Sequence, residues 1–186
     1  MKRSELIDLL ERSPVIAAVA DSKWDAAVSS PAGIIFYLQG NLLTLKERVN
    51  QAHKASKPVF VHIDLAEGIA RDKTGLAFMA ECGVDGILTT HGNLIKSARE
   101  IGLFTVQRFF ALDSKGIENV EDIVSTVSPD LIEIMPGIAY KIVSRFSSGR
   151  TPVIAGGLIE TKNEVTQALS FGATAVSTGC EELWYL

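Results

Sequence analysis

Short runs of apolar residues alternate along the chain with stretches in which apolar and charged residues recur at helical spacing. Eight of these runs follow turn or helix-breaking residues, as buried parallel strands do. They begin at Val15, Gly33, Pro58, Asp85, Phe104, Asp130, Pro152 and Ala173. The pattern therefore predicts eight strands.

Helical periodicity separates the apolar runs. It covers residues 22–29, 42–56, 69–82, 94–101, 117–127, 139–146 and 162–171. Three of these stretches are followed directly by a glycine, which suits a left-handed turn at the end of a helix: Gly83, Gly102 and Gly172. We therefore expect strands and helices to alternate along the chain.

Alternating strands and helices form a parallel sheet, which is either open and doubly wound or closed into a barrel. Eight repeats favour a compact (β/α)8 barrel of the TIM type. Such barrels usually have about 250 residues, so a chain of 186 residues needs short connections. Residues 4–13 predict an extra helix before the first strand, and residues 180–186 leave room for only a curtailed final helix. We expect residues 1–186 to form a single domain.

Composition and charge narrow the class of protein. The chain is 47% hydrophobic and 22% charged, as folded globular proteins are. Its formal net charge of -4 gives no general attraction to nucleic acid, so RNA binding would need a local basic patch. The N-terminal segment has no apolar run long enough for an export signal or a membrane span. We expect a cytoplasmic protein with no membrane partner.

A TIM barrel carries its functional residues at the carboxyl ends of its strands. Polar residues stand at most of the predicted strand ends: Asp21, Gln39, His62, Asp64, Thr90, His91, Gln107, Arg108 and Glu133. Any one of them could instead cap the next helix or bond inside the barrel. The set as a whole indicates a functional site.

Two carboxylates are expected to point into the barrel. Phe60, His62 and Asp64 share one face of their strand by the two-residue period, and Glu133 lies between the helix-facing Ile132 and Ile134. A buried carboxylate needs a partner. Arg108 could be that partner or could bind an anion, because a guanidinium group binds both carboxylate and phosphate.

Metal binding and stacking on nucleobases are not indicated. The three histidines lie on different elements, and neither they nor the two distant cysteines, Cys82 and Cys180, have ligand spacing, so we expect no metal. His91 follows a strand, as a loop or capping residue does. The aromatic residues among the strands are expected in the core: Trp24, Tyr37, Phe109 and Phe110.

Glycine-bearing turns end the last two predicted strands. Gly156 and Gly157 follow the seventh strand, before a helix that Thr161 can cap, and Ser177, Thr178 and Gly179 end the eighth. In many barrels the loops after these two strands bind phosphate, through exposed backbone N–H groups and a helix N-terminus. The glycines could also merely permit tight turns, but we expect a phosphate site.

The chain resembles a known family in long segments that cover nearly its whole length. They are "FVHIDLAEGIARDK", "GILTTHGNLIKSAREIGLFTVQRFFALDS", "IEIMPG", "PVIAGGLI" and "AVSTG", in this order. They resemble the glycerol uptake operon antiterminator family, the glycerol-3-phosphate-responsive regulators. The family pattern would place a basic residue where His91 stands. The resemblance implies a regulator that senses glycerol 3-phosphate and acts on the leader of nascent mRNA, so that transcription reads through a terminator.

Together, the strand ends and the resemblance predict an effector site without a cofactor. We expect the phosphate of glycerol 3-phosphate at the two glycine-bearing turns, and the glycerol hydroxyls near Asp64, Gln39, Arg108 and Glu133.

The surface that contacts RNA has only a weak signal. No RNA-binding motif is present. Lys141, Arg145 and Arg150 could form a basic stripe near one helix, although a solvated helix face explains them as well. A homodimer could align two such weak patches.

Two other functions remain open from the sequence. A small phosphate-binding barrel enzyme, such as an isomerase, aldolase or lyase, could use Asp64 or Glu133 as acid or base. The strand ends carry no lysine suited to a Schiff base, so we expect no catalytic residues and no enzyme activity. A metabolite-binding protein without RNA activity is the other alternative.

Overall fold

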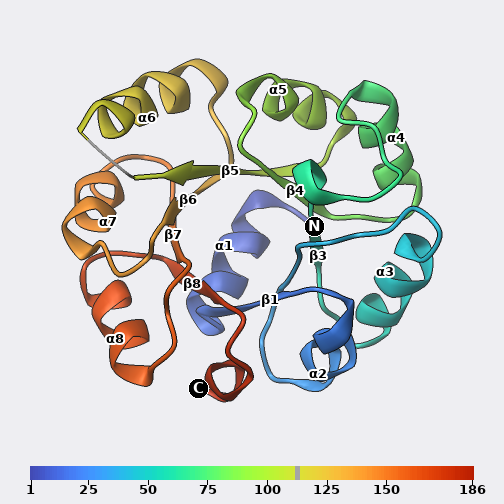
Figure 1. Cartoon of the computed structure of the whole chain (residues 1–186), viewed down its shortest axis with the longest axis horizontal. Helices are drawn as coiled ribbons and strands as arrows, with labels where there is room; N and C mark the ends of the chain where they lie inside the picture. Colours follow the sequence, from blue (N-terminus) through green and yellow to red (C-terminus); the bar gives the residue numbers. More distant parts are fainter. Residues whose placement is uncertain (112–113) are drawn as a thin grey trace.

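The computed structural model describes residues 1–111 and 114–186, where eight parallel strands close into a barrel (Figure 1). Each strand pairs with its neighbours in the chain, and β1 pairs with β8. The strands are β1 (Val15–Val19), β2 (Ile35–Tyr37), β3 (Val59–His62), β4 (Gly86–Thr89), β5 (Phe104–Phe110), β6 (Leu131–Met135), β7 (Val153–Gly156) and β8 (Ala175–Thr178). The (β/α)8 barrel predicted from the apolar runs is confirmed.

A ring of helices covers the outside of the barrel (Figure 1). They are α2 (Trp24–Ser29), α3 (Leu45–Lys54), α4 (Lys73–Glu81), α5 (Gly92–Ile101), α6 (Ser114–Val127), α7 (Tyr140–Ser147) and α8 (Lys162–Ser170), with two short 3-10 turns, η1 (Asp21–Lys23) and η2 (Ile63–Leu65). No helix among the described residues is both long and apolar enough to span a membrane.

The helices α3 and α4 begin later than the periodicity predicts, because a polar side chain fixes the preceding turn. The carboxylate of Asp72 accepts a hydrogen bond from the backbone N–H of Gly75, so α4 starts at Lys73 rather than near Ile69. The Asn41 side chain accepts from the N–H of Leu43 in the same way ahead of α3.

The N-terminal and C-terminal segments cover two different parts of the barrel. The helix α1 (Arg3–Arg12) lies across the amino ends of the strands, at the centre of Figure 1, with Leu6 and Leu10 fully buried. The short turn η3 (Glu181–Tyr185) stands between α8 and α2, where an eighth outer helix would lie. Its Trp184 is buried and donates from Nε1 to the carbonyl of Thr178 at 2.9 Å. The expected leading helix and curtailed final helix are both present.

The barrel interior is solid at its amino end and polar at its carboxyl end. Its apolar cluster comprises Leu6, Leu10, Ile16, Ile34, Phe36, Phe60, Leu88, Val106, Leu131, Ile154 and Ala175. Two residues further along three of these strands, the inward positions are occupied by His62, Arg108 and Glu133. The core therefore gives way to a polar layer at the carboxyl ends.

The aromatic residues only partly follow the expectation of a core position. Trp24, Tyr37 and Phe109 are buried, but Phe110 is 51% exposed, so that prediction is wrong for Phe110. Phe110 is the last residue of β5 and lies at the rim of the barrel. Leu65 is exposed in a similar way at the end of η2, where the strand alternation no longer holds.

Candidate functional site

A cavity of about 580 Å³ opens at the carboxyl end of the barrel. It brings together six residues that the sequence predicted for the effector: Arg108, Glu133, Gly157, Ser177, Thr178 and Gly179. The remaining lining residues are Ala18, Leu38, Met135, Leu158, Ile159, Glu160 and Cys180. The residues that line the cavity come mainly from the strands and loops of β5 to β8.

A buried hydrogen-bonded chain forms the floor of this cavity. Nε of Arg108 donates to Oε2 of Glu133 at 2.5 Å, and Oγ of Ser177 donates to Oε1 of the same carboxylate at 2.5 Å. Glu133 is fully buried, and Arg108 is only 8% exposed. Arg108 is therefore the partner of Glu133, one of the two roles that its sequence position allowed.

The same arginine keeps binding capacity for a ligand. Within the described part of the chain, only Nε of Arg108 is hydrogen-bonded, and its two terminal nitrogens are left over. Because Arg108 lines the cavity, these N–H groups are available to an anion or a hydroxyl. The ion pair with Glu133 fixes the guanidinium plane before any ligand arrives.

Gly156 supports the floor rather than lining the cavity. A Cβ atom at this position would lie 2.7 Å from Oγ of Ser177 and closer still to Oε1 of Glu133. The absence of a side chain therefore makes room for the hydrogen bond between Glu133 and Ser177.

The turn after β7 exposes backbone donors to the cavity. Gly157 and Leu158 both have positive φ, at 75° and 57°, a conformation that glycine adopts more readily than leucine. The carbonyls of Gly156 and Gly157 accept from the N–H of Gly137, which anchors the turn to the β6–α7 loop. Among the described residues, the N–H groups of Gly157 and Leu158 donate to no protein group.

The turn after β8 is held in a similar way. The hydroxyl of Thr178 donates to the carbonyl of Ile159 at 2.7 Å and accepts from the N–H of Cys180 at 3.1 Å, so it is fully engaged. Gly179 is exposed, and within the described residues its N–H is likewise left without an acceptor. Nζ of Lys23 donates to the carbonyl of Gly179 at 2.8 Å and lies 3.6 Å from Oε1 of Glu181, so the positive charge beside this turn is partly balanced.

The N-terminus of α8 is satisfied by its own side chains. Thr161 accepts from the N–H of Glu164, and the carboxylate of Glu164 accepts from the N–H groups of Thr161 and Glu160. The predicted cap at Thr161 is confirmed as a complete capping box. The carboxylate of Glu164 occupies the position that an anion would take at this helix, so the cavity's free donors are those of the two turns.

Asp64 lies beside the site, and both oxygens of its carboxylate already accept hydrogen bonds from protein groups. It accepts from the hydroxyl of Thr89 at 2.6 Å and from the N–H and hydroxyl of Thr90 at 2.7 and 2.8 Å. Burial opposes ionisation of Asp64, but these hydrogen bonds outweigh it and lower the pKa of the carboxyl. Asp64 does not line the cavity and ties the end of β3 to the end of β4.

Gln39 and His91 also lie apart from the cavity. Gln39 is exposed and borders a separate hollow of about 370 Å³ with Asp21, Asn41 and Glu67. His91 is exposed at the N-cap position of α5, where its side chain makes no capping hydrogen bond.

His62 belongs to the same polar layer as Arg108 and Glu133 but does not line the cavity, and the sequence assigns it no role. It is 4% exposed, and its Nδ1 has no hydrogen-bond partner among the described residues. Burial and the charge of Arg108 lower the pKa of His62, with Asp64 and Glu133 opposing the shift. The ring is therefore neutral at pH 7. The alternation of Phe60, His62 and Asp64 indicates its inward position.

The basic residues expected at RNA lie on another part of the surface. Lys141 and Arg145 are exposed on α7, and Arg150 follows this helix. Arg145 forms an ion pair with Glu121 of α6 at 3.0 Å. Arg145 and Arg150 border a second hollow at the amino ends of the strands, opposite the cavity. Within the described residues, no cluster of metal-ligating side chains is found.

A family model described as "Glycerol-3-phosphate responsive antiterminator" matches residues 15–184, from β1 into η3. The chain belongs to this family. The match spans all eight strands and every residue that lines the cavity, which confirms the resemblance seen in the sequence.

Two solved structures agree with this assignment, and a curated relative matches nearly the whole chain. The glycerol uptake operon antiterminator regulatory protein from Listeria monocytogenes is 34% identical, with a TM-score of 0.86 over 91% of this chain and 94% of that chain. A glycerol uptake operon antiterminator-related protein from Thermotoga maritima is 31% identical, with a TM-score of 0.83 over 92% and 98%. The uncharacterized protein YgcP from Escherichia coli is 35% identical over 97% of this chain and 96% of its own length.

Family membership bears on the choice between regulator and enzyme. The family is one of regulatory antiterminators, so the expectation of a regulator is confirmed. Solved aldolases share the barrel with TM-scores of up to 0.74, but at identities of 12–13% they show the fold alone.

Proposed function

We propose that this protein is a cytoplasmic transcription antiterminator that binds glycerol 3-phosphate in the cavity and the leader of a glycerol-operon mRNA on another surface. The observation that carries the effector site is Arg108, which Glu133 holds in place while its outer N–H groups remain available to the cavity. The family's response to glycerol 3-phosphate supports this ligand.

The phosphate group fits the two glycine-bearing turns best. The backbone N–H groups of Gly157, Leu158 and Gly179 are donors without protein acceptors in the described chain, and donors of this kind bind phosphate in many proteins. Lys23 lies at the rim, where Glu181 partly balances its charge. The turn residues themselves are uncharged, and the nearest acidic residues in the sequence are Glu160, which lines the cavity, and Glu181.

The glycerol hydroxyls then reach toward the floor. Arg108 offers N–H donors to these hydroxyls. Ser177 and Glu133 complete a polar floor whose charges are already balanced. In this arrangement Asp64 acts indirectly, by fixing the ends of β3 and β4, and Gln39 does not reach the ligand.

Calorimetric titration of the purified protein with glycerol 3-phosphate and with glycerol tests this site. We expect saturable binding of glycerol 3-phosphate and at least about 100-fold weaker binding of glycerol, because most of the donors address the phosphate. Arg108→Lys keeps the charge beside Glu133 but removes the second guanidinium donor, and it should weaken binding about tenfold.

Lys96→Met is the matched control, because Lys96 is an exposed cation of α5 that does not line the cavity. It should bind like the wild type. Equal affinity of the wild type and Arg108→Lys, or equal binding of glycerol and glycerol 3-phosphate, would contradict the proposed site.

A further inference from the structure

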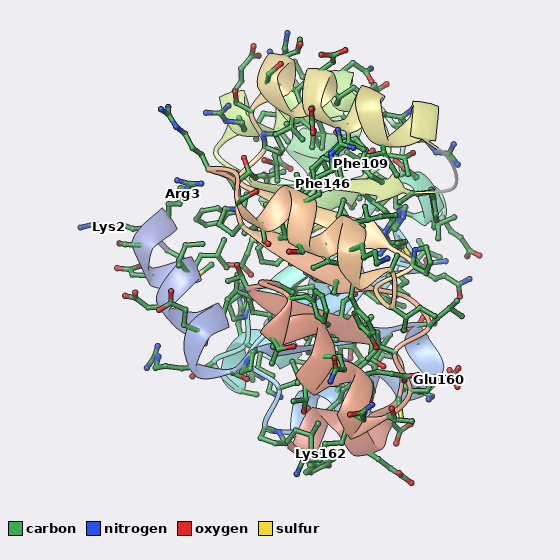
Figure 2. The ribbon with its side chains drawn as sticks, turned by 90° about the vertical axis from the view of Figure 1, so that its left-hand side faces the viewer. Lys2, Arg3, Phe109, Phe146, Glu160 and Lys162 are labelled. Carbon is green, nitrogen blue, oxygen red and sulfur yellow. The ribbon has the colours of Figure 1, made fainter. Side chains whose placement is uncertain are left out.

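A second hollow lies at the end of the barrel opposite the effector cavity. It has a volume of about 730 Å³ and is bordered by the last turns of α6 and α7, the start of α1 and the segments that lead into β6 and β7. Figure 2 shows this arrangement from the side: Lys2 and Arg3 at the start of α1 mark one end of the barrel, and Glu160 at the cavity marks the other. The two hollows are therefore separate sites.

Three arginines from three different segments surround this hollow. Arg3 comes from α1, Arg145 from α7, and Arg150 from the connection between α7 and β7. Their convergence cannot be seen in the sequence, where Arg3 is separated from the other two by most of the chain. A chain with a net charge of -4 thus gathers positive charge locally.

The acidic neighbours compensate this charge only in part. Arg145 pairs with Glu121 at 3.0 Å, and Arg3 lies 3.9 Å from the carboxylate of Asp130. Arg150 forms no ion pair with any acidic residue that the structure describes. The side chains of Arg3 and Arg145 are about half exposed, so their pairs are solvated and can exchange for another anion.

The hollow also has apolar and hydroxyl groups that a free phosphate ion would not contact. Its floor includes Ile132 and Phe146, and the Arg145 guanidinium lies 6.0 Å from the centre of the Phe146 ring. The hydroxyl of Ser125 donates to the carbonyl of Asp122, and that of Ser148 donates to the carbonyl of Arg145. Among the described residues, neither oxygen accepts a hydrogen bond, so both can accept one from a ligand. Cations around an apolar floor, with acceptors for a ribose 2′-hydroxyl, match single-stranded RNA.

We propose that the hollow between Arg3, Arg145 and Arg150 binds the phosphate backbone of the leader RNA, and this rests on the proposed antiterminator function. The strand β6 connects the two ends: Glu133 faces the effector cavity, and the preceding residue, Ile132, faces the RNA site. A ligand that binds Arg108 and shifts its partner Glu133 would move β6 and so change the affinity for RNA at the opposite end.

The test measures binding of an in vitro transcribed leader RNA of the regulated glycerol operon, with single-stranded DNA of the same sequence as a second probe. Arg3→Gln and Arg150→Gln should each weaken RNA binding at least about fivefold. Each should also reduce the salt dependence of binding, by about 0.7 in log–log slope for every phosphate that the variant no longer neutralises. The wild type should bind the RNA more tightly than the DNA.

Two control variants remove the same charge elsewhere. Arg12→Gln changes the last residue of α1. Lys162→Gln changes the first residue of α8, which is labelled in Figure 2. Both should bind RNA within about twofold of the wild type. All four variants should keep the wild-type affinity for glycerol 3-phosphate, which shows that they are folded.

Several results would overturn the proposal. Equal weakening in the test and control variants would mean that only net charge matters. Unchanged RNA binding by Arg3→Gln and Arg150→Gln, together with abolished antitermination in a reconstituted transcription assay, would assign the hollow to a protein partner instead. If the wild-type protein binds glycerol 3-phosphate but no leader RNA under any condition, the proposed RNA function itself is wrong, and this assignment fails with it.

Discussion

A single missing side chain shapes the floor of the effector cavity. Gly156 leaves the space in which Glu133 and Ser177 form their hydrogen bond, and Glu133 in turn holds Arg108. A fully buried carboxylate is costly unless it is paired and hydrogen-bonded. The arginine that is available to a ligand thus depends on a residue that does not line the cavity.

We predict that Gly156→Ala weakens binding of glycerol 3-phosphate at least about tenfold and lowers the free energy of unfolding by about 1–3 kcal/mol, the usual cost of overpacking. The reason is the clash of the new Cβ atom with Oε1 of Glu133 and Oγ of Ser177. Calorimetric titration and urea unfolding measure the two effects.

Gly179→Ala is the matched comparison, because its Cβ atom would lie at an ordinary 3.4 Å from the carbonyl of Ala18. This variant should keep the stability of the wild type, whatever its affinity for the ligand. Wild-type stability and affinity in Gly156→Ala would show that the floor does not depend on this glycine.

The sequence predicts which residues point into the barrel, but not which of them keep hydrogen-bonding groups available to a ligand. Alternation places Asp64 and Glu133 inside the barrel, and both are buried there. The carboxylate of Asp64 accepts hydrogen bonds from Thr89 and Thr90. These residues lie at the end of the next strand, 25 and 26 residues away in the sequence. No local pattern reports such a contact, because it depends on the register between neighbouring strands.

At the scale of elements, α1 closes the amino end of the barrel. Leu6 and Leu10 are fully buried and belong to the same apolar cluster as Phe36, Phe60 and Val106 inside the barrel. The chain has this additional helix before β1, whereas after β8 the short turn η3 stands where a full outer helix would lie. Because α1 fills the barrel interior at its amino end, the interior is open only toward the carboxyl end in the part of the chain that the structure describes.

We predict that Leu6→Ala lowers the free energy of unfolding by about 2–5 kcal/mol, because it leaves a cavity in the barrel interior. Asp8→Ala, an exposed position of the same helix, should change it by less than about 0.5 kcal/mol. Urea unfolding followed by circular dichroism compares the two. Equal effects would mean that α1 does not contribute to the core.

The elements are easier to predict than their boundaries. Apolar runs and helical periodicity identify every strand and the outer helices, because burial on both faces of a parallel strand leaves a clear signal. The observed starts of α3 and α4 differ from the predicted ones because the side chains of Asn41 and Asp72 fix the turns before these helices. A capping residue outweighs the apolar pattern at such positions.

At the scale of the whole molecule, the barrel separates two sites of different character. The effector cavity at the carboxyl end combines backbone N–H groups with one ion-paired arginine. The hollow at the amino end is surrounded by three solvated arginines. β6 contributes Glu133 to one and Ile132 to the other, and we propose that this strand couples the two sites.

The most direct measurement is the affinity for leader RNA with and without saturating glycerol 3-phosphate, together with the affinity for glycerol 3-phosphate with and without saturating RNA. Thermodynamic linkage requires both ratios to be equal, and couplings between sites typically amount to about 5–150-fold. We predict that each ligand changes the affinity for the other by the same factor within that range. Affinities for RNA and for glycerol 3-phosphate that are unaffected by each other would contradict an effector-controlled antiterminator.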